Sequence, residues 1–120
     1  MRDRPEPLFS VLVPAFGAER FVDAAIRSVV NQSLHDWEIV AVDDASKDST
    51  PKILERWGAV DTRIRVFSNA TNLGMTANWN RCLKEARGAL ILKLDADDAL
   101  RPQALEVLGD AMAREHVVGA

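Results

Sequence analysis

Acidic side chains gather in two short segments of this sequence that could do chemistry. The first begins with Asp43 and Asp44, and the second is Asp95-Ala-Asp-Asp98. Carboxylates this close together repel one another unless a positive charge lies among them. Oxygen ligands suit a hard divalent cation such as Mg²⁺ or Mn²⁺, and an ion held by one or two carboxylates keeps positions open for phosphate oxygens. Asp97 and Asp98 cannot point the same way on a tight turn. One of them can therefore face a metal while the other hydrogen-bonds a sugar or ribose hydroxyl.

Structural explanations of the same residues stay open from the sequence alone. Acidic turns are common, and Asp48 and Thr50 suit the start of a helix better than a ligand site. An EF-hand fits poorly, because Leu100 stands where the loop needs glycine and Pro102 starts a helix inside the loop.

The elements that must position these residues alternate between apolar runs and amphipathic stretches. The runs predict strands at 9–14, 37–42, 64–67 and 89–94, the third an edge or shorter strand, with another strand beginning at Val117 and Val118. The periodic stretches predict helices at 19–31, 50–57, 75–86 and 102–114, the third of them ended by Gly88. This alternation is typical of an α/β fold with a mostly parallel sheet, in which ligands bind at the carboxyl ends of the strands. The segments after the strands therefore carry the candidate site.

Composition narrows the class of protein further. The chain has 120 residues, a net charge of −3 and no basic stripe, so we expect one domain at most and no nucleic-acid partner. The lone Cys82 excludes an internal disulfide and is interpreted as a core residue. We expect an N-terminal tail over residues 1–8, no membrane segment, and a location in the cytoplasm or at the cytoplasmic face of a membrane.

Four segments together resemble the family 2 glycosyltransferases, which have the Rossmann-like GT-A fold. The segments are Pro14-Ala-Phe-Gly-Ala-Glu19, Val42-Asp-Asp-Ala-Ser-Lys-Asp-Ser-Thr50, Asn72-Leu-Gly74 followed by Asn80, and the unchanged Asp-x-Asp motif Asp95-Ala-Asp-Asp98. Each segment is weak alone, but four in the family's order and spacing are specific. The resemblance extends from Phe9 to about Ala113, and it implies that 9–120 is the nucleotide-sugar-binding part of a transferase domain that the chain does not complete.

The resemblance implies a metal-dependent hexosyl-type transfer from a nucleotide diphosphate sugar to an acceptor hydroxyl, with inversion. Phe16 and Asp44 would bind the base, Asp95 the ribose or sugar, and Asp97 or Asp98 the metal. The full set of implied donor-site residues is Pro14, Ala15, Phe16, Glu19, Asp44, Asn72, Asp95, Ala96 and Asp97. The acceptor would be a glycan or a lipid-linked molecule, as in cell-envelope polysaccharide synthesis. The catalytic base is expected beyond Ala120, so this piece alone is expected not to turn over.

The sequence departs from the family's pattern at three places. Phe16 stands where tyrosine is usual, Gly17 where asparagine is usual, and Trp79 where many members carry arginine. Phe16, Trp79 and Lys93 also have structural interpretations, the first two as core residues and Lys93 as a solvent-facing one. Two other functions stay open: a non-catalytic nucleotide-binding module and a Mg-dependent receiver-like domain. The second lacks an acidic phospho-acceptor after the third strand, where Ser68 and Asn69 stand.

Overall fold

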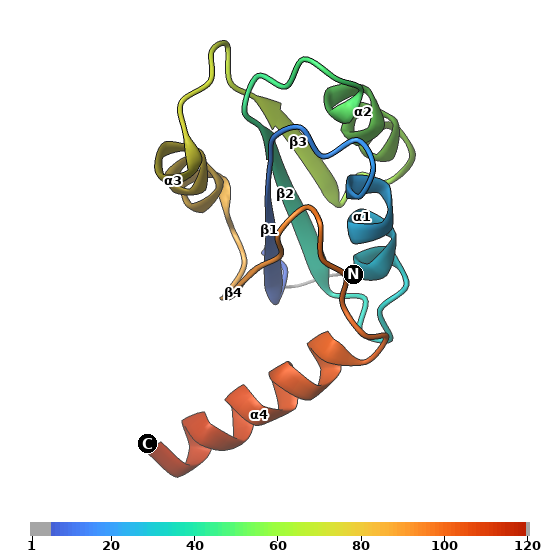
Figure 1. Ribbon diagram of the computed structural model, residues 1–120. Coiled ribbons are helices and arrows are strands. Elements are labelled where there is room, and N and C mark those ends of the chain that lie inside the picture. The colour runs from blue at the N-terminus through green and yellow to red at the C-terminus, as the bar shows by residue number, and fades with distance from the viewer. Residues whose placement is uncertain (1–5, 120) are drawn as a thin grey trace.

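A computed structural model describes residues 6–119 and shows four strands alternating with four helices (Figure 1). The strands are β1 (Phe9–Ala15), β2 (Trp37–Asp43), β3 (Ile64–Ser68) and β4 (Leu90–Lys93). The helices are α1 (Val22–Val30), α2 (Thr50–Val60), α3 (Met75–Glu85) and α4 (Ala104–Gly119). The alternation that the sequence predicts is therefore confirmed.

All four strands are parallel and lie in the order β3-β2-β1-β4. The chain thus adds β2 and β3 on one side of β1 and returns to place β4 on the other. In open α/β sheets, this reversal opens a crevice at the carboxyl ends of the strands, and ligands bind there. The segments after β1 and β4 flank that crevice. The prediction that the third strand is an edge strand is confirmed as well.

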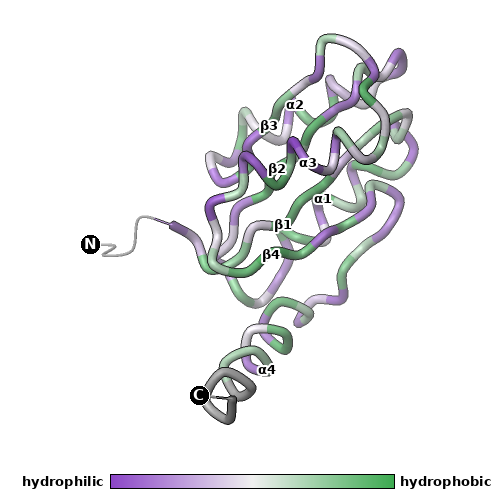
Figure 2. Tube along the Cα trace, turned by 90° about the vertical axis from the view of Figure 1, so that its left-hand side faces the viewer, coloured by the Kyte–Doolittle hydropathy of each residue, from purple (hydrophilic) through white to green (hydrophobic). Residues whose placement is uncertain are grey.

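Helices cover both faces of the sheet, which explains why its two central strands are apolar along nearly their whole length. Helices α1 and α2 lie on one face and α3 on the other (Figure 1). Successive residues of β1 alternate between the two layers: Val11 and Val13 belong to the larger core cluster with α1, and Leu12 to the smaller one with Cys82 of α3. Figure 2 shows the resulting hydrophobic centre along β1 and β2. Cys82 is fully buried, as predicted.

The amino-terminal edge of the sheet is fastened by a buried carboxylate. Glu38 accepts hydrogen bonds from the Ser10 hydroxyl at 2.6 Å and the Arg87 backbone N–H at 2.8 Å, and it pairs with Arg65 at 3.1 Å. Burial alone would raise the pKa of Glu38, but these partners together hold it below its usual value. The network joins β1, β2, β3 and the segment that leads into β4.

Gly88 is needed for close packing rather than for ending a helix. Helix α3 ends at Glu85, and Ala86 is already extended. A Cβ on Gly88 would lie 2.6 Å from the Ser10 backbone nitrogen, so only glycine lets β4 approach β1 here. The predicted role of Gly88 as the helix stop is wrong for this reason.

Helix α4 leaves the sheet at its lower end and projects away from it (Figures 1 and 2). Its start is anchored by Gln32, whose side-chain oxygen accepts from the Leu105 N–H at 3.0 Å. The prediction of a strand at Val117 and Val118 is wrong, because both lie within α4. Two β-branched residues favour a strand locally, but the preceding run of good helix formers carries the helix through them. No helix among the described residues is long and apolar enough to cross a membrane.

Candidate functional site

An open pocket of about 560 Å³ lies at the carboxyl ends of β1 and β4, between those strand ends and α3. Its lining combines apolar and charged side chains from segments far apart in the sequence. The lining residues are Pro14, Ala15, Phe16, Gly17, Ala18, Phe21, Asp44, Met75, Thr76, Asn78, Trp79, Lys93, Asp95, Ala96 and Asp97. The pocket therefore occupies the crevice that the strand order predicts.

The segment after β1 presents an aromatic ring to this pocket. Phe16 is 60% exposed, so it is a ring available to a ligand rather than a core residue. Gly17 turns the chain with φ of +61°, and its N–H donates to Ser46 Oγ at 2.9 Å. The next N–H, of Ala18, donates to Thr50 Oγ1 at 2.9 Å. These two bonds fix the Phe16 segment against the loop that follows β2.

Glu19 supports the pocket from outside it. One carboxylate oxygen of Glu19 accepts from the Ser49 N–H at 2.9 Å, at the start of α2. Asp48 likewise accepts from the backbone and hydroxyl of Thr50, at 2.9 and 2.6 Å, in agreement with its interpretation as a helix-start residue. The hydrogen bonds from Thr50 hold the pKa of Asp48 below its usual value. Glu19 and Asp48 therefore fix the two loops to each other.

Asp44 holds the loop between β3 and α3. Its Oδ1 accepts from the Leu73 N–H at 2.8 Å and the Asn69 side chain at 2.9 Å, and its Oδ2 accepts from the Gly74 N–H at 2.9 Å. Burial to 3% exposure would raise the pKa of Asp44, but the donors from Leu73, Asn69 and Gly74 outweigh it and keep the pKa low. Asp44 is thus a fixed carboxylate, and Oδ2 has room for one more donor.

The buried side-chain amides of Asn69 and Asn78 complete this network. Asn78 accepts from the Asn69 side chain at 2.9 Å and donates to the Val42 carbonyl at 3.1 Å. Asn72 donates to the Asp44 carbonyl at 3.2 Å but does not line the pocket. Asn69 stands where a receiver-like domain would need its phospho-acceptor, and here it serves as a structural link.

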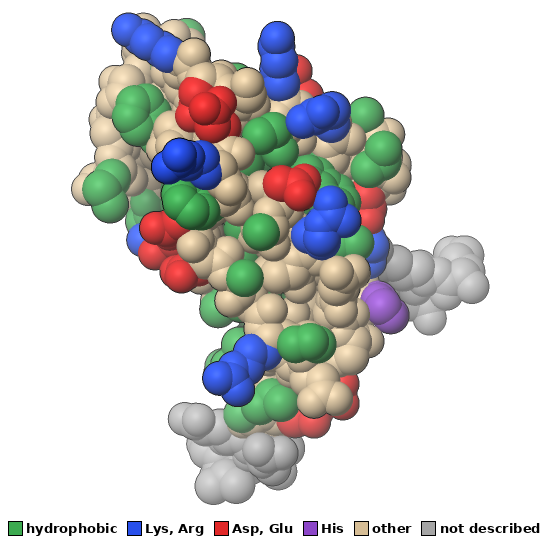
Figure 3. Space-filling model, turned by 45° about the vertical axis from the view of Figure 1, so that its right-hand side comes forward, with side chains coloured by type: hydrophobic (Ala, Val, Ile, Leu, Met, Phe, Trp, Pro, Cys, Tyr) green, Lys and Arg blue, Asp and Glu red, His purple; other side chains and the backbone are tan. Residues whose placement is uncertain are grey.

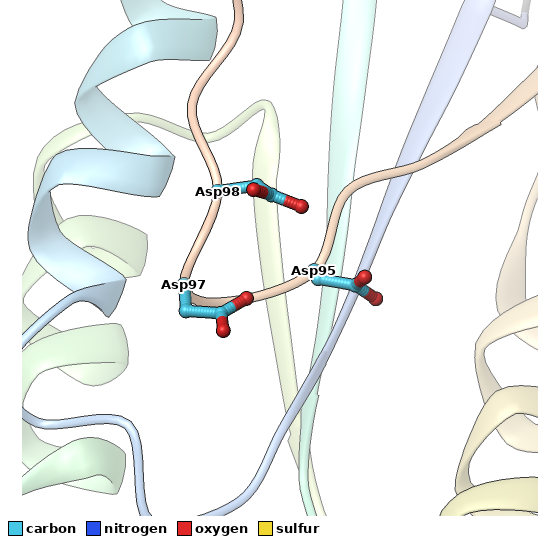
Figure 4. Close-up of side chains that lie close together, drawn as sticks. All are labelled: Asp95, Asp97 and Asp98. Atoms are coloured by element: carbon cyan, nitrogen blue, oxygen red, sulfur yellow. The ribbon is translucent and has the colours of Figure 1, made fainter.

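The turn after β4 brings three exposed carboxylates together (Figure 4). Asp95, Asp97 and Asp98 each offer an oxygen, and these oxygens lie within 4.8 Å of one another. The expectation that Asp97 and Asp98 cannot face the same ligand is therefore wrong, because the turn brings an oxygen of each to one place. A hydrogen bond of 2.9 Å from the Asp98 N–H to the Asp95 carbonyl closes the turn. A set of carboxylate oxygens without nitrogen or sulfur ligands fits a hard divalent cation. Asp95 and Asp97 line the pocket, and Asp98 stands beside it.

Lys93 provides a positive charge beside these carboxylates. Its Nζ lies 3.4 Å from Asp95 Oδ1 and 5.4 Å from the centre of the Trp79 ring. The interpretation of Lys93 as solvent-facing is confirmed, because its side chain is 46% exposed, and Lys93 also lines the pocket. Its position two residues before Asp95, at the end of a strand, was the signal that could have identified it.

Most, but not all, of the predicted site residues line the pocket. Seven of them line the pocket: Pro14, Ala15, Phe16, Asp44, Asp95, Ala96 and Asp97. Glu19, Asn72 and Asp98 lie outside its lining. Phe21, which the sequence did not single out, precedes α1, is 50% exposed and lines the pocket. Trp79, expected in the core, is only partly buried and also lines the pocket.

Comparisons with known proteins agree on one family. The family model described as "Glycosyl transferase family 2" matches residues 10–120. A Bacillus subtilis protein described as "Putative teichuronic acid biosynthesis glycosyltransferase TuaG" is 36% identical over 101 residues, which cover 84% of this chain and 40% of that protein. Escherichia coli chondroitin synthase is 33% identical over 109 residues, covering 91% of this chain and 16% of the relative. The chain therefore spans less than half the length of these relatives.

Solved structures show the same similarity. The 1–349 form of S. aureus TarS in complex with UDP-GlcNAc superposes with a TM-score of 0.84 at 30% identity, covering 90% of this chain and 32% of that one. The mannosyltransferase PcManGT from Pyrobaculum calidifontis, solved with GDP-Man and Mn²⁺, gives a TM-score of 0.71 at 24% identity, covering 78% of this chain and 28% of that one. At that identity the second similarity shows a shared fold.

Proposed function

The chain belongs to glycosyl transferase family 2, and from this premise we propose that its pocket binds a nucleotide diphosphate sugar together with a divalent cation, Mn²⁺ or Mg²⁺. The observation that carries the proposal is the convergence of Asp95, Asp97 and Asp98 at one end of a pocket that has the exposed Phe16 ring and the fixed Asp44 carboxylate. The complex of TarS with UDP-GlcNAc supports a donor of this class.

Each part of the donor then has a partner in the pocket. Phe16 stacks on the base, and Asp44 accepts a hydrogen bond from a base N–H through the free position on Oδ2. The donors from the loop hold the pKa of Asp44 below its usual value and so favour the ionised form. Its carboxylate therefore accepts and does not donate. Asp95 hydrogen-bonds the ribose or the sugar.

The cation would be held by Asp97 and Asp98, because Asp95 is already paired with Lys93. When bound, the cation stabilises the charge that develops on the leaving diphosphate. The residues of this chain bind the donor and orient it between Phe16 and the acidic turn. Transfer to the acceptor hydroxyl, a glycan or lipid-linked group, proceeds by a single displacement with inversion, in which a carboxylate base removes the acceptor's proton. We assign no such base among the described residues.

Calorimetric titration tests this proposal. The chain is titrated with UDP, GDP and dTDP, each with and without Mn²⁺, and then repeated with Asp97→Ala and Asp98→Ala. We expect metal-dependent binding of at least one nucleotide, weakened at least about tenfold in each variant, since even indirect partners of metal ligands are worth that much. Asp110→Ala is the matched control, because Asp110 is an exposed carboxylate of α4 outside the pocket. Nucleotide binding that does not depend on Mn²⁺, or that is unchanged in both variants, would contradict the proposed metal site.

A further inference from the structure

The ammonium group of Lys93 is the one positive charge among the described residues that line the pocket, where the other charged side chains are Asp44, Asp95 and Asp97. Lys93 is the last residue of β4. Its Nζ lies 3.4 Å from Asp95 Oδ1 and 5.4 Å from the centre of the Trp79 ring. The carboxylate and the aromatic ring both attract the ammonium, so together they hold a positive charge beside the acidic turn.

The ion pair neutralises one carboxylate of the acidic turn and leaves the other two. In the described part of the chain, Asp95 has this partner, while no lysine, arginine or histidine forms an ion pair with Asp97 or Asp98. Figure 4 shows the Asp95 carboxylate turned away from the other two. The empty turn therefore presents fewer uncompensated negative charges to a cation than its three carboxylates would without Lys93.

The same ammonium group acts in opposite directions on the two ligands of the proposed site. A divalent cation at Asp97 and Asp98 has the same sign of charge as Lys93, so the lysine repels it and also occupies Asp95. A nucleotide diphosphate has the opposite sign, and without Lys93 the charged lining residues would all repel it. An ammonium group has three N–H donors, and Asp95 Oδ1 engages at most one of them. Donors are therefore left for an anion.

Other basic side chains do not duplicate this charge. On the face of the molecule shown in Figure 3, the described lysine and arginine side chains stand apart from one another. That face offers no basic patch that would attract nucleotides to the chain in general. The position of Lys93 at the pocket therefore makes its charge the relevant one for the donor.

We propose that Lys93 is a binding residue that sets the order in which the donor site fills. Its ammonium group weakens cation binding to the empty acidic turn and strengthens binding of the nucleotide diphosphate before the cation arrives. This favours the route in which the nucleotide binds first and the cation follows, once the diphosphate has added its own negative charge. The assignment rests on the proposed function. It adds a binding residue from β4 and an order of binding.

Two titrations measure the two effects separately in the unmodified chain, Lys93→Met and Lys93→Arg. The first adds Mn²⁺ without nucleotide and follows the free ion by electron paramagnetic resonance. The second adds nucleotide without any divalent cation, up to millimolar concentration, and follows amide chemical shifts of the ¹⁵N-labelled chain. The nucleotide is the one among UDP, GDP and dTDP that binds best with Mn²⁺. Lys52→Met is the matched control, since Lys52 is an exposed lysine of α2 outside the pocket.

We expect Lys93→Met to change the two affinities in opposite directions. Mn²⁺ should bind about two- to fivefold more tightly and the nucleotide about two- to fivefold more weakly, which is the range for exposed charges that interact in pairs. Both effects should shrink in about 1 M salt, where the Debye length is about 3 Å. Lys93→Arg keeps the charge and should keep both affinities, and Lys52→Met should change neither.

Several results would overturn the assignment. Weaker binding of both ligands in Lys93→Met would mean that the lysine only maintains the shape of the site, and a change in one affinity alone would also contradict the proposal. Two unchanged affinities, in a variant whose circular dichroism and melting match the unmodified chain, would leave Lys93 with no role in binding. Metal-free nucleotide binding that is undetectable in the unmodified chain would exclude the nucleotide-first route.

Failure of the proposed function looks different. In that case the folded, unmodified chain would bind neither Mn²⁺ nor any of the three nucleotides, even when both ligands are present, and the assignment of Lys93 would fail with it. Binding that is present but indifferent to Lys93 would overturn this assignment and leave the proposed function standing.

Discussion

Replacing Asp44 with asparagine should destabilise the fold, although the two side chains have nearly the same shape. The carboxylate of Asp44 receives three hydrogen bonds, from Leu73 N–H, Gly74 N–H and the Asn69 side chain. In Asp44→Asn an NH₂ group replaces one oxygen and faces at least one of these donors. The variant loses that charge-assisted bond and leaves buried donors opposed to each other.

The magnitude follows from these contacts. A hydrogen bond to a charged group contributes about 1.5–3 kcal/mol, and the other two bonds weaken when the charge is lost, so we expect a loss of about 2–4 kcal/mol. A domain of this size melts about 4 °C lower for each kcal/mol, which predicts a melting temperature about 8–16 °C lower.

Thermal unfolding followed by circular dichroism measures the change. Asp98→Asn is the matched control, because Asp98 is an exposed carboxylate, and it should shift the free energy of unfolding by less than about 0.5 kcal/mol. An Asp44→Asn protein that melts within about 2 °C of the unmodified chain would refute the view that Asp44 organises the loop before α3.

Two further predictions concern stability. Gly88→Ala should cost about 1–3 kcal/mol, because its Cβ would meet the backbone of Ser10 at 2.6 Å. Gly109→Ala in α4 is its control in denaturant unfolding. A Cβ on Gly109 would lie 3.7 Å from the Phe9 ring, an ordinary contact, so the change should be neutral or stabilising by up to about 1 kcal/mol. For pH, the folded pKa values of Asp44 and Glu38 lie below their ordinary 3.8 and 4.5, so the unfolded chain binds more protons in acid. The stability from these two groups is therefore fully present above about pH 5 and is lost as pH falls through the lowered values. Denaturant midpoints measured between pH 3 and pH 7 check this, and a Glu38→Gln, Asp44→Asn double variant that keeps the full acid dependence would contradict it.

Local patterns in the sequence were sufficient to predict the strands and most helix positions. β1 and β2 are mostly apolar runs that contain valine and isoleucine, and Pro51 marks the start of α2. The parallel arrangement then placed the strand-end carboxylates at one edge, which is where the structure has the pocket and the acidic turn.

The patterns in the sequence could not predict which distant segments contact each other. Nothing near Asp44 indicates that it fixes residues 69–74, since that link depends on how β3 and α3 pack. Lys93 and Phe21 line the pocket because of the turns and strand ends around them, and the local sequence identifies neither as a site residue. The course of α4 through Val117 reflects helix propagation, which competes with the local strand preference of valine.

Titration with Mn²⁺ tests most directly whether the acidic turn of residues 95–98 is a metal site. Amide resonances of the ¹⁵N-labelled chain are recorded while substoichiometric Mn²⁺ is added, first alone and then with UDP-GlcNAc. We expect paramagnetic broadening to centre on residues 95–98 and the sugar nucleotide to strengthen it there, with shift changes at Phe16 and Lys93. Broadening centred elsewhere, or an absence of any response to the sugar nucleotide in the folded chain, would contradict the assignment of this pocket as a metal-dependent donor site.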